Sequence, residues 1–299
     1  MNIRLLVGAL VIAGLGASQG CASTPDQGGT QEPELGAVPT ITRKAEISYP
    51  LDAYRMTPEQ RLSLGRAEDL LLRDCLSRFG FAYELPSRVA ESYPDDAIGI
   101  VEESEVVQYG YKNHPIQQQA KRVEQEKAKE TPMPPAMVGV ISGQGPTRMG
   151  GEAVPEGGCS GEARRALGVT EKSQATGDEN FIIRLAAQSS HQAEADSRLK
   201  DAFAKWSGCM KEAGYFYSDP WGPNDDPAFA TETASPNELA TAKTDLACRI
   251  RFNVNGVWVA VRSAYQSRLI EQNAEALRQH KTLMDERLRK AAEIVASSR

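Results

Sequence analysis

One stretch decides how this chain is built, and it reads Trp206-Ser-Gly-Cys209-Met-Lys-Glu-Ala-Gly214-Tyr215-Phe-Tyr217-Ser-Asp-Pro220. An earlier copy reads Cys75-Leu-Ser-Arg-Phe-Gly80-Phe81-Ala-Tyr83-Glu-Leu-Pro86. When the cysteines are aligned, both copies have an apolar residue, a glycine, an aromatic residue, a tyrosine and a proline at the same spacing, without a gap. This match indicates a structural unit that occurs twice.

Each copy predicts a helix, a glycine stop and a short extended segment. Apolar residues recur at three- and four-residue steps before each cysteine, as one buried helix face requires. These residues are Leu64, Ala67, Leu71 and Cys75 in the first copy, and Leu199, Ala202, Trp206 and Cys209 in the second. Gly80 and Gly214 are then expected to end the helices, because glycine adopts the left-handed conformation without a Cβ clash.

The rest of the pattern predicts a mainly α-helical fold. Capping boxes at Thr57-Pro-Glu-Gln60 and Ser235-Pro-Asn-Glu238 mark two helix starts, the second opening a long helical region. Further helical segments are expected over residues 103–108, 161–167 and 181–214, and a weak point is expected at 254–256. Short strands are expected over residues 81–85, 98–101 and 137–141.

The amino terminus is typical of an exported protein. Residues 1–20 combine a positive start with an apolar run too short to span a membrane, which predicts a signal peptide. Cys21 resembles the lipidated cysteine of a bacterial lipobox, which would attach the mature protein to a membrane. Ser18 and Gln19 depart from the usual lipobox residues. The alternative is ordinary cleavage near Ala17 to Ala22, which gives a secreted protein.

Composition divides the mature chain. Residues 21–50 are rich in Pro, Gly, Thr, Gln and Glu and predict a flexible tether. Residues 51–175 are expected to hold the first repeat with a loop-rich insertion, and residues 176–299 the second repeat with a long C-terminal helix. A single domain over 51–299 is the alternative.

Four cysteines remain once Cys21 is set aside, and in an exported chain they predict two disulfides. Three pairings are open. We favour Cys75–Cys159 and Cys209–Cys248, because each joins a repeat cysteine to the next cysteine downstream.

Residues 269–299 carry a seven-residue apolar repeat in which Lys281 is the one polar member. The repeat consists of Ile270, Ala274, Leu277, Lys281, Met284, Leu288, Ala291 and Val295. One interpretation is an amphipathic helix that folds back on its own domain. The other is an arm that self-associates or docks on a protein partner.

Charge and composition exclude several kinds of site. The net charge of -6 and the lack of a basic block argue against nucleic-acid binding. The Gly-rich loop over 143–158 lacks a phosphate-binding motif. His114, His191 and His280 lie outside any metal-binding frame and are expected at the surface. The loop from Asp219 to Asp226 lacks the pattern of a calcium loop. We therefore predict no metal, no cofactor and no catalytic residue.

Four parts of the sequence carry a resemblance to known proteins. They are the repeat, Tyr109-Gly-Tyr111, Pro155-Glu-Gly-Gly-Cys159-Ser-Gly-Glu-Ala163, and the segment from Asp245-Leu-Ala-Cys248 through Trp258 to Tyr265-Gln-Ser-Arg-Leu-Ile-Glu271. Together they resemble a group of exported actinobacterial proteins described as secreted proteins or lipoproteins. The resemblance covers roughly residues 55–290. It implies an extracytoplasmic envelope setting and carries no assigned activity or site residues.

The sequence thus favours a non-enzymatic, exported envelope lipoprotein that binds a partner protein or a cell-wall component. One alternative is an envelope hydrolase without a visible motif, which a pocket lined by paired carboxylates would favour. The other is an exported small-molecule-binding protein, which an apolar cavity of ligand size would favour.

Overall fold

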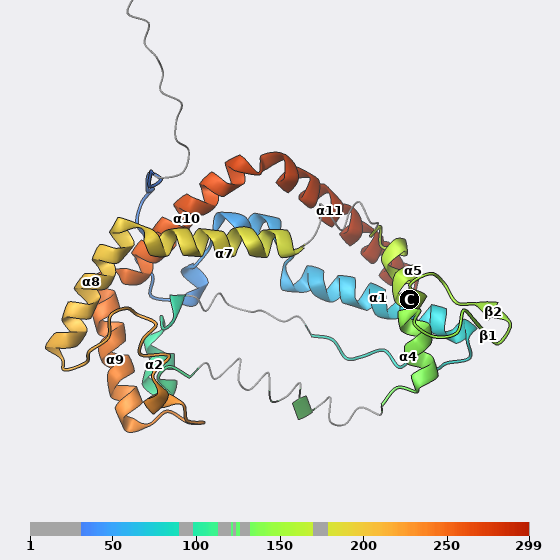
Figure 1. Ribbon diagram of the computed structural model, residues 1–299, viewed down its shortest axis with the longest axis horizontal. Coiled ribbons are helices and arrows are strands. Elements are labelled where there is room, and N and C mark those ends of the chain that lie inside the picture. Colours follow the sequence, from blue (N-terminus) through green and yellow to red (C-terminus); the bar gives the residue numbers. More distant parts are fainter. Residues whose placement is uncertain are drawn as a thin grey trace, which may run out of the picture. The chain divides into compact units, whose positions relative to one another are not determined.

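The computed structural model in Figure 1 describes residues 31–89, 98–112, 121, 124–125, 132–169 and 179–298. The described residues from Pro33 onward form one compact unit. The predicted signal peptide over 1–20 and the predicted lipidation site Cys21 lie outside the described residues. The described part is mainly helical with a single two-stranded sheet, which confirms the predicted fold class.

The α-helices are α1 (Pro58–Arg78), α2 (Glu103–Tyr109), α4 (Pro135–Ser142), α5 (Gly158–Ala166), α7 (Glu179–Ala195), α8 (Ser197–Glu212), α9 (Pro236–Arg251), α10 (Val254–Gln272) and α11 (Ala274–Ser297). The 3-10 helices are η1 (Lys44–Glu46), η2 (Pro50–Tyr54) and η4 (Pro227–Phe229). Strands β1 (Arg148–Met149) and β2 (Glu152–Ala153) pair antiparallel, with Arg148 opposite Ala153.

Local sequence explains where α1 and α9 begin. Thr57 Oγ1 accepts from Gln60 N at 3.2 Å, and Gln60 Oε1 accepts from Thr57 N at 2.8 Å, so the predicted capping box is present. Ser235 also caps α9, because its Oγ accepts from Glu238 N at 3.1 Å. The predicted second half of that box is absent, since Glu238 Oε1 accepts instead from Tyr111 N at 3.1 Å.

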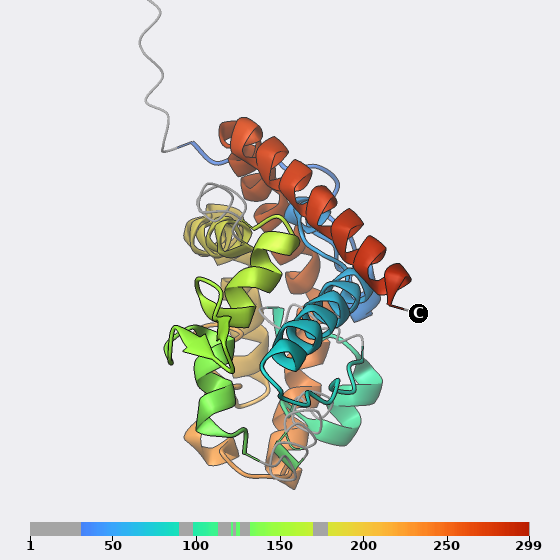
Figure 2. The same ribbon diagram turned by 90° about the vertical axis from the view of Figure 1, so that its right-hand side faces the viewer.

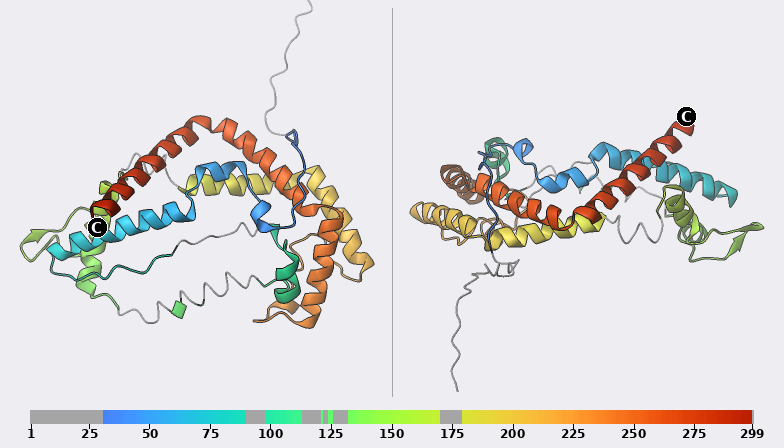
Figure 3. Two further views of the ribbon diagram at one scale, coloured as in Figure 1. Left: turned by 180° about the vertical axis from the view of Figure 1, so that it is seen from behind. Right: turned by 90° about the horizontal axis from the view of Figure 1, so that it is seen from above.

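Helix α10 packs against α7, α8 and α9 (Figure 3). Trp258, Val261 and Tyr265 on α10 are buried together with Leu199 on α8. Ile41, from the segment before η1, is buried in the same cluster. The segment before η1, helix α8 and helix α10 thus share one buried cluster, and burial of its apolar side chains stabilises their packing.

Helix α11 lies against α1 (Figure 2), and it is the long C-terminal helix that the heptad pattern predicts. Ala291 is buried between Ala67 of α1 and Leu167, while Leu277 joins the cluster around Leu51. The repeat face of residues 269–299 is therefore used within the chain, as the fold-back interpretation expects.

The break between α9 and α10 falls at Asn253, directly before the predicted weak point at 254–256. Asn253 has φ +49°, and it is the one non-glycine residue with positive φ in the described part of the chain. Its Nδ2 donates to Pro39 O at 2.9 Å. Gly256 is required here, because a Cβ at that position would lie 1.9 Å from Pro39 O.

The three predicted strands are wrong. Residues 81–85 and 98–101 form no strand, and residues 137–141 lie inside α4. Pro134 and Pro135 open α4, with Pro135 at the first helical position, where a missing N–H costs nothing. Met137 and Val140 are its buried residues. A short apolar run fits a strand and a buried helix turn equally well, so periodicity could not separate them.

The predicted flexible tether does not extend to residue 50. Ile41 and Tyr49 are buried, and Pro33 O accepts from Arg198 Nη1 at 2.8 Å. Lys44 N donates to Glu102 Oε1 at 3.0 Å. The segment has few apolar residues, but several of them reach the core, which composition averaged over the segment could not reveal.

Candidate functional site

Both repeat glycines end a helix as predicted. Gly80 has φ +77° and Gly214 has φ +90°. Phe81 N donates to Leu76 O at 3.1 Å, and Tyr215 N donates to Met210 O at 2.9 Å. These bonds close the same left-handed helix end in both copies, so the sequence repeat is also a structural repeat.

Both favoured disulfides are present. Cys75 of α1 is bonded to Cys159 of α5, with the Cα atoms 5.7 Å apart. Cys209 of α8 is bonded to Cys248 of α9, with the Cα atoms 5.8 Å apart. Each repeat helix is therefore joined covalently to a helix further along the chain. We call these the first pair (α1 and α5) and the second pair (α8 and α9).

The other repeat residues also hold the fold. Tyr83 Oη donates to Asp69 Oδ1 at 3.4 Å, while Tyr217 Oη donates to Asp226 Oδ2 at 2.7 Å. Burial, followed by this bond to Asp226, raises the pKa of Tyr217 to about 12. Trp206 and Pro220 are buried, whereas Pro86 is exposed.

A buried charged cluster lies beside the second disulfide. Asp245 Oδ1 accepts from Trp206 Nε1 and from Arg249 Nε, each at 2.7 Å. Asp245 Oδ2 accepts from Tyr111 Oη at 3.1 Å. Burial and then the nearby Asp245 charge raise the pKa of Tyr111, which keeps its hydroxyl protonated and donating. We call these four side chains the Asp245 cluster.

Arg249 of this cluster joins three parts of the chain. Its Nη1 donates to Ile98 O at 2.7 Å, and its Nη2 donates to Pro220 O at 2.6 Å. Asn255 on α10 donates in turn to Ile100 O at 3.1 Å. A guanidinium offers five donors in a fixed plane, so one arginine can hold two loops against α9.

A second buried charge fixes α2 against α9 (Figure 1). Glu238 is fully buried, and its Oε2 lies 3.2 Å from Lys112 Nζ. Lys112 Nζ also donates to Phe229 O. A Cβ on Gly110 would lie 3.0 Å from Glu238 Oε1, so glycine permits this close approach. The chain after α2 is thereby anchored to α9 and to η4.

A cavity of about 280 Å³ opens between these anchored parts, and we call it the α2–α9 cavity. Its polar wall is contributed by Lys44, Glu105, Tyr111, Lys112, Asn224 and Arg249. Its apolar wall includes Ile100, Val106 and Trp221. Lys44 Nζ and Glu105 Oε2 form an ion pair of 2.7 Å on this wall. The cavity thus combines paired charges with aromatic and aliphatic surface.

A smaller hollow of about 10 Å³ shares Pro220, Trp221 and Arg249 with this cavity. Trp258 lines the hollow and is 3% exposed. Its Nε1–H has no hydrogen-bond partner among the described residues. A buried donor without a partner costs free energy.

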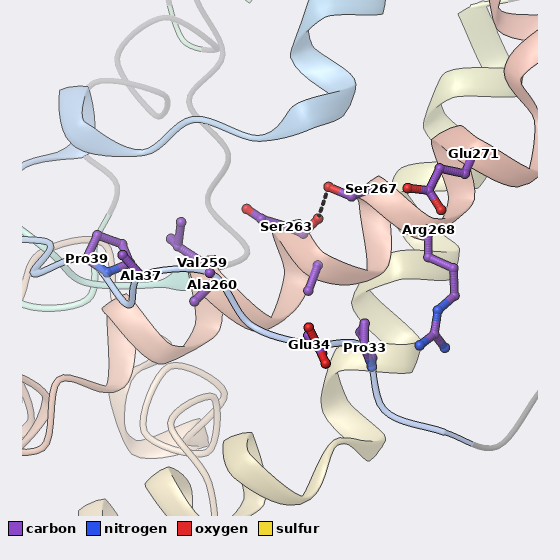
Figure 4. A pocket seen from close by; sticks show the side chains of 12 residues that line it. Pro33, Glu34, Ala37, Pro39, Val259, Ala260, Ser263, Ser267, Arg268 and Glu271 are labelled. Carbon is purple, nitrogen blue, oxygen red and sulfur yellow. Dashed lines mark hydrogen bonds between the residues drawn. The ribbon is translucent and has the colours of Figure 1, made fainter.

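A second hollow of about 510 Å³ lies where the extended segment 33–39 crosses α10 (Figure 4). Figure 4 shows Ser263 and Ser267 along α10, with Pro33 and Glu34 on the crossing segment. Ser267 Oγ donates to Ser263 O at 3.0 Å, a bond within the helix. The wall is mainly small side chains without a buried charge, so this hollow is the weaker candidate.

Asp219 and His280, both considered in the sequence, have structural partners. Asp219 Oδ1 accepts from Trp221 N at 3.0 Å, which ties the acidic loop to itself. His191 is exposed, but His280 is buried with Nε2 2.9 Å from Tyr54 O, so the expected surface position of His280 is wrong. His114 lies outside the described residues.

The described ranges contain no group of three His, Cys, Asp or Glu side chains placed to hold a metal ion. Within the same ranges, no helix has the length and apolar character needed to cross a bilayer.

The fold and site define a mainly helical protein with two disulfide-joined helix pairs and a cavity beside the second pair. No protein-family model, no curated protein and no solved structure matches the chain.

Sequence reasoning missed the residues of the cavity and the neighbouring Asp245 and Trp258. Tyr111, Asp245 and Trp258 contribute only to the family resemblance, without a role. Lys44 carries no signal that separates it from other surface residues, and the sequence marks Asn224 only as part of the acidic loop from Asp219 to Asp226. One signal was present in the sequence. Asp245 and Arg249 are four residues apart on a predicted helix, a spacing that favours an ion pair on one helix face.

Proposed function

We propose that this protein is a non-enzymatic, exported envelope lipoprotein that binds a cell-wall component in the α2–α9 cavity. Cys21 holds the mature protein at the outer face of the cell membrane. The observation that carries the proposal is that three described acidic side chains at or next to the cavity, Glu105, Glu238 and Asp245, each already have a basic partner.

Three ion pairs surround the cavity. Glu105 is paired with Lys44, Glu238 with Lys112, and Asp245 with Arg249. A general acid or base must exchange a proton with its substrate, which a carboxylate held by a cation does poorly. Among the described residues, Glu105 is the one carboxylate that lines the cavity, so this part of the wall does not present the paired carboxylates of a glycoside hydrolase. This arrangement favours binding over hydrolysis.

The two disulfides favour an extracytoplasmic location, since such bonds persist mainly in oxidising compartments. The N-terminal sequence supports the same location, with the lipobox-like Cys21 as the attachment point. Export and lipidation are tested together by Cys21→Ser, which we expect to move the protein from the membrane fraction to the medium or the soluble envelope fraction.

A protein partner for residues 269–299 is a separate proposal. Helix α11 buries Leu277, Met284 and Ala291, so a partner could use this face only if α11 left α1. The exposed side of α11 carries ion pairs such as Arg289–Glu293, at 2.7 Å. The structure therefore gives stronger support to the cavity than to α11 as the binding surface.

The decisive experiment is co-sedimentation of the detergent-solubilised, full mature protein with insoluble cell wall, followed by mass spectrometry of the supernatant. We expect the protein to sediment with the wall and to release no wall fragments. Asn224→Trp should weaken sedimentation at least tenfold, because the exposed Asn224 lies at the cavity wall.

The matched control is Phe216→Ser, which changes an aromatic residue that is 77% exposed and does not line the cavity. It should sediment like the wild-type protein. Turnover of the wall into soluble fragments would contradict the non-enzymatic proposal, and failure of the wild-type protein to sediment would contradict wall binding.

A further inference from the structure

The volume of the α2–α9 cavity limits the size of the ligand that it can hold. The volume of about 280 Å³ lies just below the range of about 300–1,000 Å³ that drug-sized ligands occupy. One six-membered ring with its substituents fits such a space. An extended chain would have to lie mostly outside it.

The charges of the wall narrow the ligand further. Lys44, Lys112 and Arg249 line the cavity, and each has an acidic partner within 3.2 Å. A charged ligand would have to break one of these pairs or remain unpaired in a partly buried site, and both outcomes are costly. The wall therefore suits a ligand without net charge.

The wall still offers many hydrogen-bonding atoms. Lys44 and Glu105 keep donors and lone pairs beyond their shared ion pair, because an ammonium has three donors and a carboxylate about four acceptor sites. Asn224 is exposed at the wall, and its Nδ2 donates to Asp225 Oδ1 at 3.1 Å, which leaves its carbonyl oxygen available. Trp258, whose buried Nε1–H has no hydrogen-bond partner among the described residues, lines the adjoining hollow.

The apolar wall is rigid and aromatic. Trp221 meets Phe203 and Trp258 edge-on, with ring centroids 5.1 Å and 5.4 Å away. A Trp held in this way loses little conformational freedom when a ligand packs on it. Sugar rings present C–H groups on their faces and hydroxyls at their edges, which matches an aromatic wall beside a ring of polar groups.

We propose that the α2–α9 cavity binds one ring of an uncharged, polyhydroxylated sugar. This inference rests on the proposed function, since it names the part of the wall that would be recognised. A ring hydroxyl or its substituent lies toward the hollow at Trp258, and the ring face packs against Trp221.

The test is a titration of the full mature protein with four soluble probes while tryptophan emission is recorded. The probes are a neutral N-acetylated hexosamine, an unmodified neutral hexose, a sugar acid of the same ring size and a short wall-type peptide. Trp221 and Trp258 lie at the site, so an occupied cavity should change their emission. We expect a neutral sugar to bind with millimolar affinity, as about a dozen heavy atoms allow, and at least tenfold more tightly than the sugar acid.

Asn224→Ala and Asn224→Trp should each weaken sugar binding at least tenfold, while Phe216→Ser should leave it unchanged. Asn224 is exposed, so these variants keep the fold, which far-ultraviolet circular dichroism checks. Trp221→Leu removes the aromatic ring on which the sugar is proposed to pack. Its effect on sugar binding is interpreted only if its far-ultraviolet circular dichroism spectrum matches that of the wild-type protein.

The outcomes separate the two proposals. If a neutral sugar binds and insoluble wall competes with it, the ligand is part of the wall polymer. If a neutral sugar binds but insoluble wall does not compete, the ligand is a free sugar, and only the wall-binding proposal is overturned. Binding of the peptide or the sugar acid in place of neutral sugars overturns this inference and leaves wall binding intact. No binding of any probe, together with no sedimentation on wall, overturns both.

Discussion

The first and second disulfide-joined helix pairs share a scaffold but differ in where their charges lie. In the first pair, Asp69 is bonded to Arg88, whose side chain is 41% exposed. In the second pair, Asp245 is bonded to Arg249, whose side chain is 3% exposed. Both pairs thus have a buried carboxylate, but the arginine is partly exposed in the first pair and buried, where it holds two loops, in the second. The second pair adjoins the cavity.

Removing the disulfides should produce the largest effects on stability. In the loop-entropy model, opening the loop of 84 residues between Cys75 and Cys159 costs about 4.6 kcal/mol, and opening the loop of 39 between Cys209 and Cys248 costs about 3.9 kcal/mol. The double variants Cys75→Ser/Cys159→Ser and Cys209→Ser/Cys248→Ser would be compared by denaturant unfolding. A second-pair variant that lost more stability than the first would show that local packing outweighs loop length.

Variants of the two ion pairs should give the clearest difference in unfolding free energy between the first and second helix pairs. Arg249→Met leaves Asp245 buried without its cation, and we expect a loss of about 3–5 kcal/mol of unfolding free energy. Arg88→Met removes a partly exposed arginine from the buried Asp69, which also accepts from Tyr83 Oη, and should cost less, about 1.5–3 kcal/mol. Both variants would be measured by urea unfolding at one pH. Equal losses would mean that the burial of Arg249 has no energetic consequence.

The glycine ends of the two repeat helices offer a smaller comparison. Gly80→Val and Gly214→Val each place a β-branched side chain at positive φ, which should cost about 1–2 kcal/mol. Neither position has an atom within 4 Å of an added Cβ, so conformational strain is the whole effect. Thermal unfolding of the two variants should therefore give similar shifts. A large difference would reveal a contact that forms in one copy alone.

The smallest expected effect concerns alkaline pH. The pKa of Tyr217 is raised to about 12 from an ordinary value of 10.0, so the folded state favours the protonated phenol. This contribution is complete below pH 10 and is lost as pH rises toward 12. Tyr217→Phe should thus flatten the fall in stability between pH 9 and pH 12, measured by unfolding at each pH. An unchanged slope would show that Tyr217 does not contribute to it.

Much of the scaffold could be predicted from the sequence because its signals are local. The cap at Thr57, the stops at Gly80 and Gly214 and the break near Asn253 each depend on a few neighbouring residues. The disulfide pairing also followed from the order of the repeats. Short apolar runs misled the strand predictions, because residues 137–141 fit two periodicities until α4 buried Met137 and Val140 on one side.

The cavity could not be predicted because it is not local. Lys44, Tyr111, Asn224 and Arg249 come from four separate parts of the chain, and only folding brings them together. Even the role of Glu238 was misassigned, since its place in a capping pattern gave no sign that Tyr111 N would bind its carboxylate. Long-range polar partners of this kind leave no spacing in the sequence.

The disulfides join cysteines that are neighbours in chain order, Cys75 with Cys159 and Cys209 with Cys248. A chain that crosses a membrane from its amino terminus presents its thiols to the oxidant one at a time. If each thiol is oxidised in the order in which it reaches the far side of the membrane, the native disulfides form without rearrangement. This requires that Cys21 does not first form a disulfide with Cys75. Attachment of a lipid to the sulfur of Cys21 would remove that competitor, so anchoring the protein would also protect the fidelity of its oxidation.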